Sequence, residues 1–304
     1  MARAIHTLDL NFQNRKNAIA AYLIPHSEGA ALVESGPGST IDSLKAEIAK
    51  HGFTVNDLTH VFLSHIHLDH AGAAGWLAQQ GVQVCVHPRG APHLLNPEKL
   101  IASATRIYKE DMDRLWGDFL AVPEDKLIAA EDGQEITVGD LKIKAIHTPG
   151  HAEHHISWGI EDDIVFTGDI GGVRMFGYGY VRLPLVPPEL HLERWHDSLE
   201  KLLSMNFKRI APTHFGVFDD AEWHINAAIA SVASTSRWLD EVMPSEPSID
   251  ELGKKVVNWM LEEALAEGVS EETLKVYEIA NPLHMSSTGL ARYWTKFRQA
   301  AQSQ

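Results

Sequence analysis

Short apolar runs that end in turn residues recur along the chain up to about residue 215. Such runs are typical of buried strands, and they read "AAYLI", "GAALVESG", "HVFLSH", "VQVCVHP", "LKIKAIHTPG", "DDIVFTGD" and "FKRIAPTH". Helical patterns lie between several of them. In residues 39–52, for example, Ile41, Leu44 and Ile48 share one face and Gly52 supplies a stop. This alternation predicts an α/β fold whose sheets are covered by helices.

Strand patterns stop near residue 219, and helical patterns continue to the end of the chain. One of these helices is predicted to begin at Ser248, which forms a capping-box pair with Glu251, and to end at Gly268. A second helical stretch, at about 92–121, interrupts the strands and is a candidate lid or interface element. We therefore expect one domain over residues 1–219, with this helical insertion, and a helical C-terminal extension over residues 220–304.

Composition and charge narrow the class of protein. The chain has 304 residues, is 44% hydrophobic and carries 26 basic against 41 acidic side chains, a net charge of −15. Phosphate backbones are repelled by such a charge, so nucleic acid is not an expected partner and a small-molecule substrate is. No segment has the length and apolar character of a signal peptide or a membrane span. With the single cysteine, Cys85, this predicts a cytoplasmic protein without a membrane partner, and the sequence leaves a homodimer open.

Side chains that bind metals collect where the predicted strands end. The stretch "SHIHLDH" at 64–70 follows an apolar run, and alternate residues of an extended segment point the same way. It contains His65, His67, Asp69 and His70, and three further predicted strands end in His151, Asp169 and His214. In open α/β folds, ligands gather at the carboxyl ends of strands. The pattern favours a metal site over scattered core histidines.

In the order in which they occur, the motifs "SHIHLDH", "TPGH", "TGD" and "PTHFG" resemble those of the metallo-β-lactamase-fold hydrolase superfamily, over residues 17–219. The resemblance implies a four-layer αββα sandwich with its metal site at one edge. It also implies a first metal on His65, His67 and His151, a second metal on Asp69, His70 and His214, and Asp169 as the bridge between them. The longer strings "HPRGAPH" and "TPGHAEHH" are most similar to a little-characterised branch with a helical C-terminal extension.

These ligands predict a particular chemistry. So many imidazoles favour two zinc ions, although iron and manganese accept the same mixed set. A hydroxide shared by two metals could attack an ester, thioester, lactone or amide bond of a small molecule, with Asp69 and Asp169 as the catalytic carboxylates that position it. The alternatives are a mononuclear iron oxygenase acting on a sulfur substrate, a phosphodiesterase or nuclease, and a metal-stabilised binding protein.

Residues 171–188 combine glycines with aromatic and basic side chains, the composition of a small-molecule pocket. The candidate substrate contacts are Tyr178, Tyr180, Arg174 and Arg182, together with His155 beside the "TPGH" motif. The same segment could instead fill the core or pack against another subunit. Asp219 and Asp220 stand where a helix N-cap is expected, and we predict that they cap that helix.

Overall fold

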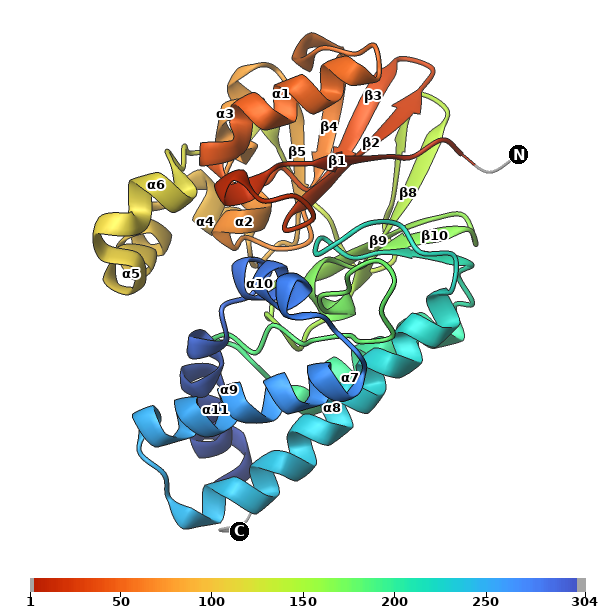
Figure 1. Ribbon diagram of the computed structural model, residues 1–304. Coiled ribbons are helices and arrows are strands. Elements are labelled where there is room, and N and C mark those ends of the chain that lie inside the picture. The colour runs from red at the N-terminus through yellow and green to blue at the C-terminus, as the bar shows by residue number, and fades with distance from the viewer. Residues whose placement is uncertain (1–2, 300–304) are drawn as a thin grey trace.

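The computed structural model describes residues 3–299, so the predicted domain limits at residues 1 and 304 lie outside the described residues. Its centre is a pair of mixed sheets (Figure 1). The first sheet contains, in spatial order, β1 (His6–Asp9), β2 (Ala20–His26), β3 (Gly29–Val33), β4 (Leu58–Phe62), β5 (Gln83–Val86) and β6 (Leu127–Ala129). The second contains β11 (Arg209–Ala211), β10 (Ile164–Phe166), β9 (Ile156–Ile160), β8 (Leu141–His147) and β7 (Glu135–Val138).

Strand direction explains why the ends of several strands meet. From β3 to β6 the first sheet is parallel, whereas β1, β2 and β3 pair antiparallel. In the second sheet β10 and β11 are parallel, and the other pairs are antiparallel. Parallel neighbours end at the same edge of a sheet, so the loops that follow β10 and β11 leave one edge of the second sheet, and those that follow β3 and β4 leave one edge of the first.

Four layers result from the way side chains alternate along the strands. In β4, Val61 belongs to the core under the helices α1 (Ile41–Lys50) and α3 (Ala74–Gln79), while Phe62 faces the second sheet. There the Phe62 ring meets that of Trp158 at a centroid distance of 5.0 Å. The outer face of the second sheet packs on α7 (Leu192–Ser204) and α8 (Ala221–Val242) through residues that include Trp195 and Ile225. The predicted αββα sandwich is confirmed.

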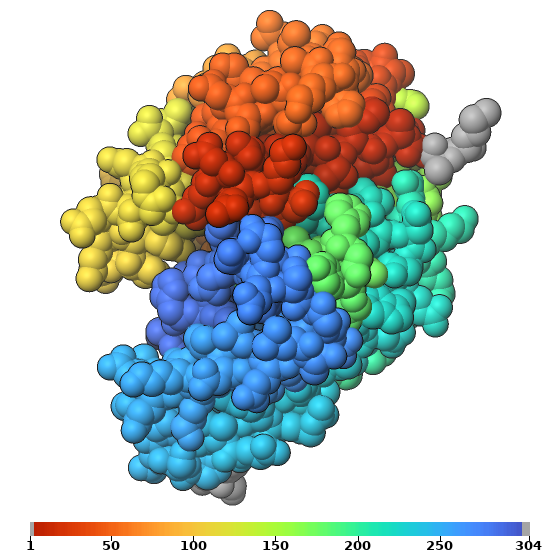
Figure 2. Space-filling model, viewed as in Figure 1, coloured from red at the N-terminus to blue at the C-terminus, as the bar shows by residue number. Residues whose placement is uncertain are grey.

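The stretch that interrupts the strands is helical, as predicted. It consists of α4 (Ala91–Leu95), α5 (Glu98–Tyr108) and α6 (Met112–Trp116), here called the insertion helices. Tyr108, at the end of α5, lies with its hydroxyl 3.5 Å from the sulfur of Met285 in the C-terminal region. Figure 2 shows the insertion helices (yellow) and the C-terminal helices (blue) next to each other on one face of the molecule.

Helices continue after α8, as predicted, with α9 (Ile249–Ala266), α10 (Glu271–Ala280) and α11 (Ser286–Tyr293). The Ser248–Glu251 capping box is confirmed, because each side chain accepts a hydrogen bond from the other residue's backbone N–H. In Figure 1 these helices occupy the lower half of the view, and α10 lies closest to the sheets. Among residues 3–299, no helix combines the length and apolar character that a bilayer span requires.

Candidate metal centre

All seven predicted ligands meet at one edge of the sandwich. His65 and His67 follow β4, and Asp69 and His70 lie in the short helix α2 (Leu68–Ala71). The others also follow strands: His151 comes after β8, Asp169 after β10 and His214 after β11. Their donor atoms form two groups, and within each group all the atoms lie within 4.8 Å of one another.

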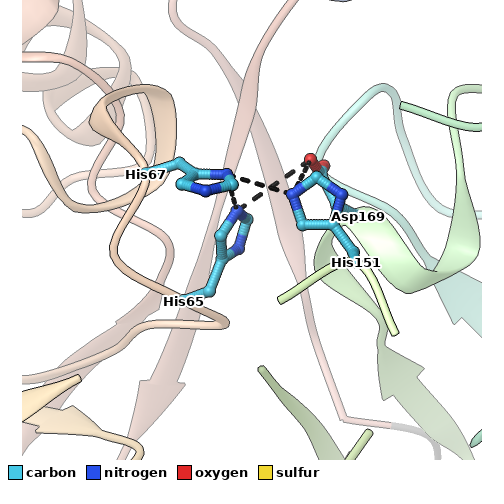
Figure 3. A group of neighbouring side chains, drawn as sticks. All are labelled: His65, His67, His151 and Asp169. Carbon is cyan, nitrogen blue, oxygen red and sulfur yellow. Dashed lines mark hydrogen bonds and ion pairs between the residues drawn. The ribbon is translucent and has the colours of Figure 1, made fainter. Parts of the chain in front are cut away.

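The first group consists of His65, His67, His151 and Asp169 (Figure 3). The Nδ1 atom of His67 lies 2.8 Å from Nε2 of His65 and 3.0 Å from Nε2 of His151. Oδ2 of Asp169 is 3.2 Å from Nε2 of His151 and 3.9 Å from Nε2 of His65. Three imidazole nitrogens and one carboxylate oxygen therefore converge, a donor set that suits zinc and other borderline divalent ions.

The second group consists of Asp69, His70 and His214. Oδ2 of Asp69 lies 3.5 Å from Nε2 of both histidines. The other carboxylate oxygen of Asp169, Oδ1, lies 3.3 Å from Nε2 of His70 and 3.4 Å from Nε2 of His214. Asp169 thus directs one oxygen at each group, which is the position of a bridging ligand.

Hydrogen bonds on the outer side of the rings fix which nitrogen faces the centre. Nδ1–H of His151 donates to the carbonyl of Pro184 at 3.0 Å, and Nδ1–H of His214 donates to that of Ala18 at 2.7 Å. Because a carbonyl oxygen can only accept, each neutral ring must present the lone pair of Nε2 to the centre. This arrangement orients both imidazoles before a metal binds.

Glu34 belongs to the same framework, although it is not among the residues predicted from the sequence. It follows β3 and is 1% exposed. Its Oε1 accepts hydrogen bonds from Nδ1 of His70 at 3.0 Å and from the hydroxyl of Thr213 at 2.9 Å, and its Oε2 lies 3.3 Å from the amide nitrogen of Ser64. The signal was present in "ALVESG", since Glu34 too stands at the end of a predicted strand.

The electrostatics of the centre favour a bound cation. Burial, followed by the neighbouring histidines, lowers the pKa of His65 and His67, so their rings are neutral. Burial also opposes protonation of His70, but Asp69 and Asp169 outweigh it and raise the pKa of His70 well above its usual value. Nε2 of His70 and Oδ1 of Asp169 are both buried, and neither makes a well-aligned hydrogen bond within the described residues. Divalent ions would satisfy these atoms, so the residues present fit the metals.

Comparison with known proteins agrees with this geometry. The family model of the metallo-beta-lactamase superfamily matches residues 15–214, more than half of the chain. The chain belongs to this superfamily. The matched residues include all seven ligands and the insertion helices, and they end before α8.

Relatives within the superfamily are distant. A metallo-beta-lactamase fold-containing protein of Sulfurisphaera tokodaii is 26% identical over 220 residues, 71% of this chain and 79% of that protein. An atrochrysone carboxyl ACP thioesterase of Cryptosporiopsis sp. is 23% identical over 88% of this chain, but the match spans only 66% of the relative. A solved metallo-beta-lactamase family protein of Thermus thermophilus has a TM-score of 0.67 at 18% identity, covering 98% of this chain and 94% of that one. That likeness concerns the fold alone.

A mostly apolar pocket of about 350 Å³ opens beside the ligands in this member of the superfamily. His67, Asp69 and Asp169 are among the residues that line it. The insertion helices and the C-terminal region contribute to its walls, through apolar residues that include Leu100, Ile107, Leu115, Ile279 and Met285. A mostly apolar cavity of this size that includes some polar groups is typical of small-molecule sites.

The aromatic and basic residues predicted as substrate contacts lie elsewhere. Within the described residues, none of Tyr178, Tyr180, Arg174, Arg182 and His155 lines the pocket. The hydroxyl of Tyr180 donates to the carbonyl of Met260, and that of Tyr178 lies 3.0 Å from the hydroxyl of Thr273. These two residues hold the helices α9 and α10 against the loop after β10.

The basic residues and His155 have protein partners as well. Arg182 donates to the carbonyl of Asn281. Arg174 donates to both carboxylate oxygens of Asp220, at 2.6 and 2.8 Å. Asp220 does occupy the N-cap position of α8, but it makes no side-chain capping bond, so the capping prediction was wrong for this carboxylate. His155 is fully buried against Thr148.

Proposed function

We propose that the protein is a binuclear metal-dependent hydrolase that cleaves an ester, thioester, lactone or amide bond in a small molecule with an apolar body. One observation carries the proposal: two ligand groups share Asp169, which lines a mostly apolar pocket. One ion would be held by His65, His67 and His151, the second by Asp69, His70 and His214, and Asp169 would contact both. Zinc suits these donors best.

Bound divalent ions would acidify a water molecule and polarise the carbonyl of the substrate. Asp69 lines the pocket with a side chain that is 20% exposed, so its carboxylate can accept a hydrogen bond from the attacking water. As the water oxygen bonds to the carbonyl carbon, Asp69 takes up the proton that the water loses. The bond to the leaving oxygen, sulfur or nitrogen then breaks, and that atom receives the proton.

The shape of the pocket and the named relatives favour acyl substrates. The apolar residues that line the pocket stabilise an alkyl or aryl body by removing it from water. Two fungal relatives are described as atrochrysone carboxyl ACP thioesterases, although the chain spans only 66% and 54% of them. Thioesters and esters of apolar acids are therefore the first substrates to test.

The test combines metal analysis with a substrate panel. We expect about two metal equivalents per chain, and hydrolysis of apolar esters or thioesters that a chelator abolishes and added zinc restores. Asp69→Asn should remove activity, while Asp197→Asn, at an exposed site on α7, should not. One iron per chain with oxygen consumption on a sulfur substrate would identify the oxygenase instead. Turnover of phosphodiesters alone would also overturn the proposal.

A further inference from the structure

The pocket lining contains one side-chain amide that has no hydrogen-bond partner among the described residues. Asn281 directly follows α10, lines the pocket and is 3% exposed. Its Oδ1 is buried without a hydrogen bond, and its side-chain amide makes none with any described residue. A buried amide is almost always satisfied in a native protein, so one without a partner beside a pocket indicates a group that a ligand satisfies.

Helix capping does not account for this side chain. Asn281 occupies the C-cap position of α10, but its φ of −148° is extended rather than left-handed. The capping bond there is made by its backbone N–H, which donates to the carbonyl of Tyr277. Any residue except proline could donate that bond, so it does not require the side-chain amide.

A buried arginine and an aromatic ring hold the backbone of Asn281. Nη2 of Arg182, which is 2% exposed, donates to the carbonyl of Asn281 at 3.0 Å. The same guanidinium lies over the ring of Tyr277, with Cζ 5.0 Å from the centroid. The hydroxyl of Tyr277 in turn donates to the carbonyl of Tyr180 and accepts from the amide of Met175. A buried cation that stacks on an aromatic ring fixes the chain at this point.

We propose that Asn281 determines substrate specificity: it hydrogen-bonds a single carbonyl or hydroxyl group carried on the apolar body of the substrate, and Arg182 positions it. This inference rests on the proposed function, because it assumes that the substrate hydrolysed at the candidate metal centre fills this pocket. It assigns the choice of substrate to the C-terminal extension, which lies outside the residues that match the superfamily.

The test measures a preference rather than a rate. N-acetylcysteamine thioesters of decanoic acid and of its keto and hydroxy positional isomers share one reacting group and differ only in the polar group. The wild type should prefer one oxygenated isomer over the plain chain by roughly tenfold or more in kcat/KM. Asn281→Leu should bring this ratio close to one with unchanged metal content. A control, Asn226→Leu on the exposed face of α8, should keep the ratio of the wild type.

Arg182 is tested through the same ratio. Arg182→Met should lower the preference several-fold, and Arg182→Lys, which retains a donor, should restore part of it. A folded Arg182→Met protein with the preference of the wild type would refute the positioning role. If Arg182→Met does not fold, Asn281→Leu still decides the main claim.

Failure of the proposed function gives a different result. If no thioester is hydrolysed, binding of plain and oxygenated decanoic acids to the metal-loaded protein is measured by calorimetry. Tighter binding of one oxygenated acid, lost in Asn281→Leu, would support Asn281 even if the hydrolase proposal fails. Equal binding or turnover of all isomers by the wild type, or a preference that survives Asn281→Leu, would overturn the specificity role.

Discussion

Replacing Glu34 by glutamine tests how the second ligand group is built. Glu34 Oε1 accepts from both His70 and Thr213, and Oε2 faces the amide of Ser64. Glutamine has the same shape, but it loses the negative charge and turns one oxygen into a donor. In either orientation of the amide, an NH₂ group then faces an N–H or O–H donor. His70 therefore loses part of what orients and polarises its ring.

The magnitude follows from the partners that are lost. Changes to hydrogen-bond partners of metal ligands typically weaken metal binding about 10- to 100-fold, or about 1.4 to 2.7 kcal/mol. This loss should fall on the site of Asp69, His70 and His214, because Glu34 contacts none of His65, His67 and His151 directly. Glu34→Ala should be harsher, destabilising the fold by at least about 3 kcal/mol, since three buried donors lose their acceptor.

The assay is a zinc titration of the metal-free protein by calorimetry, with metal content checked after dialysis. Two binding events are expected in the wild type, and Glu34→Gln should weaken only one of them. Glu135→Gln, which changes an exposed carboxylate on β7, is the matched control. Unchanged affinities at both sites, or an equal loss at both, would refute the assignment of Glu34 to His70.

Three further predictions concern the centre, the pH dependence and the C-terminal extension. Asp69→Ala should reduce metal content from about two ions to one and abolish hydrolysis, while the protein remains folded. Metal analysis and circular dichroism measure these effects. A variant that hydrolyses substrate normally with one ion would contradict the two-metal proposal. His224 is buried, and burial with the nearby Arg174 charge lowers its pKa to about 4. As the pH falls, the unfolded chain protonates His224 near pH 6.5 and the folded chain does not. Between pH 6.5 and 4 the free energy of unfolding of the wild type, measured in urea, should therefore fall by about 3 kcal/mol more than that of His224→Gln. The same pH dependence in both proteins would contradict this. Ser248→Ala removes the N-cap of α9 and should lower the free energy of unfolding by about 1 kcal/mol. An unchanged midpoint of urea unfolding would mean that this cap does not stabilise the fold.

The ligands could be predicted because each follows a local signal, whereas their partners could not. His65, His151, Asp169 and His214 all stand within a few residues of an apolar run, and the strand ends bring them together. Glu34 follows such a run too, but only the pairing of β3 with β4 brings it close to His70. Register and pairing depend on contacts between distant segments, which a single sequence does not reveal.

The aromatic segment 171–188 shows how composition can mislead about position. Its aromatic and basic residues suit a pocket wall, and equally a surface covered by helices. In the structure α9 and α10 cover it, and the Tyr180 hydroxyl donates to the Met260 carbonyl. Asp220 similarly binds Arg174 instead of capping α8, because a bidentate ion pair is stronger than a capping hydrogen bond. Nothing in the local pattern around Asn281 marks it as a pocket residue.

The charges that line the pocket help to distinguish between the reactions that the candidate metal centre could support. Among the described residues that line it, there is no arginine, and Lys99 on the exposed side of α5 is the only lysine. A phosphodiester brings one negative charge and a strand of nucleic acid brings many to a protein whose net charge is −15, and among the pocket residues few cations would offset them. A neutral acyl compound meets no such penalty and gains from burial of its apolar body. The apolar wall and the acidic surface therefore both favour carbonyl hydrolysis over phosphodiester cleavage at the same ligand set.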